Sequence, residues 1–266
     1  LRSSGPVNSL SFARLYKFTV SGFALNYVTP VGLMGGEPYR IMELTPYVGV
    51  ERATSSVILY VMMHIFSHFC FWLSSVLIYV FFYPVGWGMG IVLGLITLFC
   101  LLLVTLFIKG YRNGMAVACI RLGSHIPFLK KRAVRFAELH KEKLETIDSQ
   151  IALLHQQRKS TFYSALGLEY TARIVGCLEV WLILNVLTTD VSFVGCILIV
   201  AFSSLLANLL FFLPMQLGGR EGGFALAVAG LSLSGAYGVF AALITRVREM
   251  VWIVIGLVLM KIGNRR

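Results

Sequence analysis

The chain has 266 residues, of which 58% are hydrophobic and only 13% are charged. A mean hydropathy of +0.81 over that length excludes an ordinary soluble domain and indicates an integral membrane protein. The formal net charge is +11, but no nucleic-acid-binding motif accompanies it, and we expect no nucleic-acid partner. Because Lys and Arg gather in cytoplasmic loops, the charge predicts orientation in the membrane instead.

The cysteines and the start of the chain give little information about the function. The cysteines form no CxxC pair, so neither a disulfide framework nor a zinc site is expected, and they fit small core positions. They are Cys70, Cys100, Cys119, Cys177 and Cys196. The chain starts at Leu1 without a signal peptide, which leaves room for an upstream segment such as a first membrane helix.

Two glycine-rich, charged breaks interrupt the apolar sequence, one from Asn26 to Arg40 and one from Asn208 to Gly223. In each, a proline is followed by two adjacent glycines and, seven positions after the proline, by a glutamate. These residues are Pro30, Gly35, Gly36 and Glu37 in the first break, and Pro214, Gly218, Gly219 and Glu221 in the second. The likeness predicts two related elements.

Residues 1–108 form the expected first membrane repeat. Its apolar run 18–29 is too short to cross a bilayer, and Pro38 suits the first turn of a second short helix. We therefore predict a re-entrant helical hairpin at about 12–46, buried in protein or lining a wet cavity. The long uncharged segments 57–83 and 86–108 are predicted to span the membrane.

Residues 109–159 are the expected cytoplasmic loop, since they hold eleven Lys or Arg against four acidic residues. Leu144, Ile147, Ile151 and Leu154 recur at helical spacing, which predicts an amphipathic helix on the inner leaflet. A solvated connector without any lipid contact is the alternative.

Residues 160–266 form the expected second membrane repeat, with a span at 161–187, a re-entrant hairpin at about 192–235 and a last span at about 237–260. The hairpins then enter from opposite sides, as in transporters built from inverted repeats. The predicted fold is an all-α integral membrane protein, a polytopic helical bundle of two inverted repeats that each contain a re-entrant hairpin. The C-terminus is expected to be cytoplasmic.

Charged residues within these apolar segments are the candidate site. Amides at a helix start favour an anion such as phosphate, and arginine binds phosphate bidentately. The substrate-binding candidates are Gly35, Gly36, Glu37, Arg40, Gly218, Gly219, Arg220, Glu221, Arg246, Arg248 and Glu249. The alternative is an internal ion-pair network in which the glutamates hold the arginines.

A second group of polar residues ranks lower as lining of a cavity. It comprises Asn26, His64, His68, Glu169, Arg173 and Asn208, with Glu179. Glu169 and Arg173 are spaced to pair on one helix, and the two asparagines are expected at helix ends. His64 and His68 lie one turn apart, but no HExxH pattern surrounds them, so we expect neither a metal nor zinc hydrolysis.

The pattern Asn-x3-Pro30-x4-Gly-Gly-Glu37-Pro38-x-Arg40, with Pro214-x3-Gly-Gly-x-Glu221 and Arg246 before a terminal glycine-bearing span, resembles the transmembrane region of lysylphosphatidylglycerol synthases. This is the family of the multiple peptide resistance factor's flippase domain. The resemblance implies an integral membrane protein that moves a lipid between leaflets. We expect no aminoacyltransferase domain after Arg266, so we do not take the resemblance to imply lysine transfer from tRNA.

The expected function is therefore a flippase in the cell (inner) membrane, without enzymatic activity or a cofactor. Its expected cargo is a phosphate-bearing lipid, an aminoacylated phospholipid or a polyprenyl-linked lipid. A homo-oligomer or a lipid-synthesising enzyme is a further expected partner. One alternative is a membrane-embedded transferase, although 109–159 lacks a carboxylate cluster for a metal-bound donor. The other is a scaffold for a cytoplasmic synthase.

Overall fold

The computed structural model describes residues 10–29, 35–113, 149, 159–188, 191–210 and 216–262. Within these ranges the chain is helical and contains no strand. The helices are α1 (Phe12–Val28), α2 (Gly36–Val48), α3 (Val50–Phe82), α4 (Trp87–Asn113), α8 (Lys159–Leu187), α9 (Phe193–Leu209), α10 (Gly219–Gly230) and α11 (Gly235–Ile262). The expected amphipathic helix of the basic loop lies outside the described residues.

Helix boundaries follow local signals in the sequence. The Ser11 hydroxyl accepts a hydrogen bond from the Arg14 amide at 3.3 Å, and Ser192 caps α9 in the same way. Pro46, the expected end of the second short helix, lies inside α2, which continues to Val48. The turn into α3 is made at Gly49, whose φ of 82° is accessible to glycine without strain.

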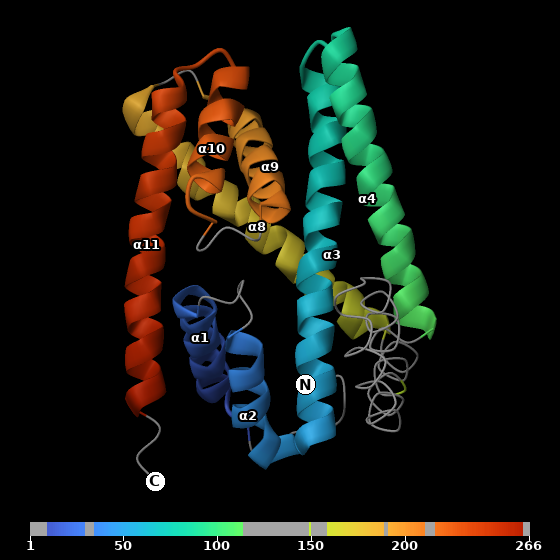
Figure 1. Ribbon diagram of the computed structural model, residues 1–266, viewed down its shortest axis with the longest axis vertical. Helices are drawn as coiled ribbons and strands as arrows, with labels where there is room; N and C mark the ends of the chain where they lie inside the picture. The colour runs from blue at the N-terminus through green and yellow to red at the C-terminus, as the bar shows by residue number, and fades with distance from the viewer. Residues whose placement is uncertain are drawn as a thin grey trace, which may run out of the picture.

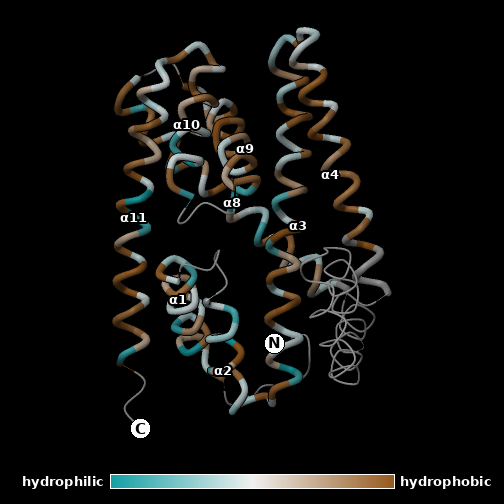
Figure 2. Tube along the Cα trace, viewed as in Figure 1, coloured by the Kyte–Doolittle hydropathy of each residue, from teal (hydrophilic) through white to brown (hydrophobic). Residues whose placement is uncertain are grey.

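Three helices are long and apolar enough to cross a membrane within the described part of the chain: Val50–Phe82, Trp87–Leu106 and Phe162–Leu187. α11 has 28 residues and is about 42 Å long, but it carries three charged residues near its middle (Figure 2). The architecture is thus all-helical, with several apolar helices that suit a membrane helical bundle.

Two pairs of short helices occupy opposite ends of the molecule (Figure 1). The α1–α2 pair lies at the lower end and the α9–α10 pair at the upper end, and α11 runs beside both. α3 and α4 form a long hairpin on the other side, and α8 runs obliquely behind. The end of α1 and the start of α10 therefore face each other halfway along α11.

Two apolar clusters pack the helices around α8 and α9. Leu184, Ile199 and Val228 form a buried cluster among α8, α9, α10 and α11. Cys100 and Cys177 are fully buried in a second cluster around Phe71, where α3, α4, α8 and α9 meet. These two thiols occupy small core positions, as the sequence predicted.

Glycines let α11 approach both short-helix pairs closely. A Cβ on Gly256 would lie 2.5 Å from the Val20 carbonyl oxygen of α1, and one on Gly238 would lie 2.4 Å from the Phe224 carbonyl oxygen of α10. The Ser21 hydroxyl also donates to the Gly256 carbonyl at 3.0 Å. α11 therefore joins the lower pair to the upper pair as one stiff element.

Candidate functional site

The first charged cluster lies where α1 and α2 meet. Asn26 accepts a hydrogen bond from the Gly36 amide at 2.6 Å and donates to Glu37 Oε1 at 3.1 Å. Arg40, one turn further along α2, reaches the same oxygen at 3.4 Å and donates to the Thr19 carbonyl at 3.3 Å. Arg40 is only 8% exposed, so its charge is held inside the helix pair.

The glycines of this cluster are required for close approach of the helices. A Cβ on Gly36 would lie 2.1 Å from the Gly22 carbonyl oxygen, and a Cβ on Gly22 would lie 2.5 Å from Arg40 Nε. A Cβ on Gly35 would meet the Thr29 hydroxyl at 2.4 Å. The backbone of α2 therefore lies directly against α1 at this point.

Replacing Gly36 with alanine is expected to lower the free energy of unfolding by about 1–3 kcal/mol, because the methyl group overlaps the backbone of α1. Gly222→Ala is the matched control, since nothing lies within 4 Å of a Cβ at that position and alanine suits a helix better than glycine. Thermal unfolding of both variants in the same detergent makes the comparison. Equal midpoints would contradict the close packing of α1 and α2.

The second charged cluster joins the start of α10 to the middle of α11. Glu221 accepts a hydrogen bond from the Gly218 amide at 2.9 Å through Oε2, and its Oε1 pairs with Arg246 Nε. Arg220 pairs with Glu249 and donates to the Thr245 hydroxyl at 3.3 Å. Arg246 and Glu249 are 8% and 6% exposed, so two ion pairs are largely removed from solvent.

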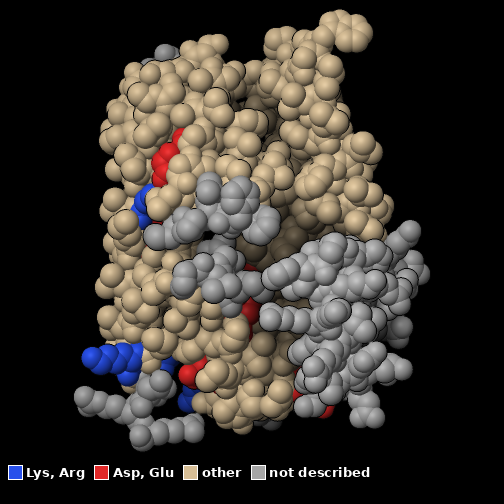
Figure 3. Space-filling model, in the orientation of Figure 1, with Lys and Arg blue, Asp and Glu red and all other residues tan. Residues whose placement is uncertain are grey.

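Arg248 extends this cluster to α8. Its Nη1 lies 2.6 Å from Glu179 Oε2, and its Nη2 lies 3.9 Å from Glu249 Oε1. The charges of the cluster then balance, with three arginines facing three glutamates: Arg220, Arg246 and Arg248 against Glu179, Glu221 and Glu249. Among the described residues on the face drawn in Figure 3, charged side chains reach the surface in small patches.

The two Gly-Gly pairs look alike in the sequence but serve different purposes. Gly218 has φ of 79°, a conformation that favours glycine, whereas nothing lies within 4 Å of a Cβ there. Gln216, two positions before Gly218, also has a positive φ, and its carbonyl accepts a hydrogen bond from Arg246 at 3.3 Å. The second pair therefore shapes a turn, whereas the first pair permits helix contact.

A third polar cluster links α3 to α8. His64 Nδ1 and Glu169 Oε2 lie 3.1 Å apart. Arg173 donates to the Ser67 hydroxyl at 2.8 Å and to the His64 carbonyl at 2.9 Å. The expected ion pair between Glu169 and Arg173 is therefore wrong, because each side chain turns to α3 instead of to its neighbour on α8.

Tyr60 and Tyr27 connect the clusters. The Arg40 guanidinium lies 5.1 Å from the centre of the Tyr60 ring, and Tyr60 lies one turn before His64 on α3. Tyr27 lies at the end of α1, which packs along α11, the helix that carries Glu249. The first cluster thus lies near the third through Tyr60 and near the second through Tyr27.

One comparison with known proteins decides the family. The model of the lysylphosphatidylglycerol synthase TM region matches residues 6–257 of the 266. The chain belongs to this family. A comparison with curated proteins and another with solved structures each found no match. The lysylphosphatidylglycerol synthase TM region family is a membrane family named for a lipid, so the chain is a membrane protein with a lipid-related role.

The structure of this family member brings most of the predicted residues together. Glu37 and Arg40 form one cluster, and the charged candidates of the second break form another. The glutamates hold the arginines, as in the internal network that the sequence left open. The Gly36 and Gly218 amides, expected to meet an anion, are already capped by side chains.

Two candidates lie apart from the ion pairs. Asn208 is exposed, and its amide donates to the Ser204 carbonyl of its own helix at 2.8 Å. His68 lies between His64, which it meets edge to face, and Trp72, and its buried Nδ1 has no hydrogen-bond partner in the described part of the chain. Among the described residues, no group of three or more His, Cys, Asp or Glu side chains could hold a metal ion.

Sequence reasoning missed three polar contributors to the site: Tyr60, Ser67 and Thr245. Each lies in an apolar segment and looks like an ordinary helix residue there. For Tyr60 the signal was spacing, since Tyr60 and His64 are four residues apart on one helix face. Thr245 could have been found only from its position directly before Arg246.

Proposed function

We propose that this membrane protein translocates a phosphate-bearing lipid between leaflets. In this proposal α1–α2 and α9–α10 are re-entrant hairpins of two inverted repeats, which enter the bilayer from opposite sides and meet near its centre. The opposed positions of the two helix pairs beside α11 support it (Figure 1). The basic segment 109–159 and the C-terminus would face the cytoplasm of a cell whose inner membrane holds the protein.

The buried charge at the middle of α11 carries the proposal. An arginine at the centre of a bilayer costs about 2.5–3.5 kcal/mol on insertion scales. Arg246 lies near the middle of α11 beside Arg248 and Glu249, and the rest of that helix is uncharged up to its last turn. A protein needs no such residues to fold as a bundle, because apolar side chains would pack there at lower cost. Intramembrane ion pairs of this kind commonly mark a substrate pathway.

The ion pairs suggest how a head group is exchanged. In the unloaded protein Glu221 and Glu249 hold Arg246 and Arg220. A lipid phosphate would accept hydrogen bonds from the same guanidinium groups, whose planar donors suit two phosphate oxygens. The released carboxylates would then accept a cationic part of the head group or a proton. Membrane lipids are accordingly the proposed partners, and the chain itself performs no covalent chemistry.

A reconstitution assay tests this function. Purified chain in vesicles that contain a trace of fluorescent phosphatidylglycerol should speed movement of the label between leaflets, as reported by an impermeant quencher in the outer solution. A fluorescent glycolipid without phosphate serves as the matched tracer and should move at the rate of protein-free vesicles. Equal rates with and without protein for both tracers would refute lipid translocation.

The same preparation separates the rival functions. A transferase would form a new lipid product when supplied with donor molecules, whereas a flippase changes only the leaflet of its lipid. A scaffold would lose function in cells when residues 127–157 are deleted, yet would tolerate Glu37→Gln. We expect Glu37→Gln to reduce transport, because Glu37 holds Arg40 and Asn26 in place.

A further inference from the structure

Aromatic and polar rings form a ladder along one face of α3. Tyr60, His64, His68 and Trp72 follow one another at four-residue intervals. Neighbouring ring centres lie 6.1, 5.3 and 5.4 Å apart in that order. The lower rungs lie beside charged groups, since Arg40 covers Tyr60 and Glu169 meets His64.

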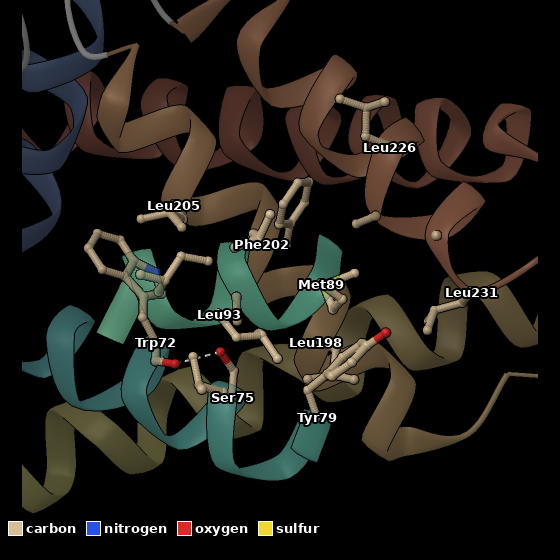
Figure 4. Close-up of a pocket in the computed structure, with 16 residues that line it drawn as sticks. Trp72, Ser75, Tyr79, Met89, Leu93, Leu198, Phe202, Leu205, Leu226 and Leu231 are labelled. Carbon is tan, nitrogen blue, oxygen red and sulfur yellow. Dashed lines mark hydrogen bonds between the residues drawn. The ribbon is translucent and has the colours of Figure 1, made fainter. Parts of the chain in front are cut away.

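The ladder ends in an apolar groove. A cavity of about 330 Å³ lies between α3 and α4 on one side and α9 and α10 on the other. Trp72, the last rung, forms one of its walls, and the lining continues along α3 through Val76 to Tyr79 (Figure 4). The face of α3 therefore changes from charged to apolar at Trp72.

Polar atoms at the Trp72 end of the groove are already satisfied within the protein. The Trp72 indole N–H donates to the Ser204 hydroxyl at 2.9 Å, and the Ser75 hydroxyl donates to the Trp72 carbonyl at 2.7 Å. Leu93, Leu198 and Leu205 contribute only hydrocarbon. An occupant therefore gains from apolar contact and has little to gain from hydrogen bonds, as for an alkyl chain.

We propose that this track holds one phospholipid before its phosphate moves to the arginines of the second cluster, with the head group beside His64 and Arg173 and one acyl chain in the groove. His64 and Trp72 are about 12 Å apart along the helix axis, less than half of a hydrocarbon core about 30 Å thick. The acyl chain of a lipid whose phosphate lies at His64 is therefore long enough to reach the groove. This inference rests on the proposed function. It means that the protein recognises the acyl chain of the lipid as well as its head group.

Quenching of Trp72 by brominated lipid tests the groove. The full-length protein in detergent is titrated with phosphatidylglycerol brominated along its acyl chains. The fluorescence of Trp72 is obtained as the difference between wild type and Trp72→Phe, which keeps the other three tryptophans in place. We expect saturable quenching of this difference signal at low lipid concentration.

Two variants narrow the groove at different points. Ala201→Leu fills it near Trp72, and Gly230→Leu fills it at a position where nothing lies within 4 Å of a Cβ. Each should raise the lipid concentration that gives half-maximal quenching by about tenfold, because the added side chain takes space that the acyl chain would fill. Leu98→Phe, at an exposed site on α4 that does not line the groove, is the control and should leave quenching unchanged.

The outcomes distinguish this inference from the proposed function. If quenching is the same in wild type, Gly230→Leu and Leu98→Phe, the groove does not hold the acyl chain, even if the protein transports lipid. If quenching is saturable and Gly230→Leu weakens it, the groove holds the acyl chain, even if vesicles show no transport. Should Ala201→Leu fail to fold, Gly230→Leu alone still decides, because its site has room for the added side chain.

Discussion

Replacing Glu249 with alanine is expected to lower the free energy of unfolding by about 3–5 kcal/mol, the cost of leaving a buried charge without its partner. Glu249 is 6% exposed and pairs with Arg220, whose side chain is 18% exposed. Among the described residues, its removal leaves the Thr245 hydroxyl, at 3.3 Å, as the remaining side-chain hydrogen-bond partner of Arg220. Unfolding in a fixed detergent, followed by circular dichroism, measures the loss.

Glu179→Ala is the matched control for this prediction. Glu179 also pairs with an arginine, Arg248, but the two side chains are 27% and 48% exposed. The proposed lipid pathway admits water beside Arg248, and ion pairs that water reaches contribute about 0–1 kcal/mol, so this variant should unfold close to wild type. A loss as large as that of Glu249→Ala would mean that burial does not set the strength of these pairs.

A variant with both Arg246→Gln and Glu221→Gln is expected to fold normally and to lose transport. Replacing both partners of a buried pair by neutral groups is often harmless to stability, and glutamine can still accept from the Gly218 amide. The phosphate, however, loses a charge-assisted donor. Such bonds contribute about 1.5–3 kcal/mol, so transport of fluorescent phosphatidylglycerol should fall roughly 10- to 100-fold.

The single variant Arg246→Gln separates stability from function. It leaves Glu221 without its cation and should unfold more easily than the double variant, because a carboxylate then stays partly buried without a counter-charge. Asn208→Ala, at an exposed site outside the clusters, should match wild type in both assays. A double variant that transports at the wild-type rate would exclude Arg246 from phosphate binding.

Local sequence signals predicted the helix pairs and the family, whereas contacts between distant helices could not be predicted. Proline, glycine and charge placed the breaks before α2 and α10 correctly because these residues act on their own backbone. The resemblance to lysylphosphatidylglycerol synthases is confirmed by the family match over 6–257. Spacing on one helix failed for Glu169 and Arg173, since His64 and Ser67 on α3 offered nearer partners.

The same limit applies to the two Gly-Gly pairs. Their shared pattern predicted a shared role, but the role of each is set by its surroundings. Glycine is needed at position 36 because the backbone of Gly22, on a different helix, lies against it. Glycine is needed at position 218 because of the positive φ of that residue. Likewise, Arg248 and Glu179 are far apart in the sequence and meet only because α8 passes beside α11.

The equal number of arginines and glutamates around α11 has an electrical consequence. A charge that crosses the full membrane potential gains or loses about 2.3 kcal/mol per 100 mV, but a group of three positive and three negative side chains carries no net charge. Movement of this group as a unit across the membrane field would then be insensitive to voltage. In the proposed flippase, a current recorded during turnover would therefore report the charge of the lipid and of ions that travel with it, and not movement of this group.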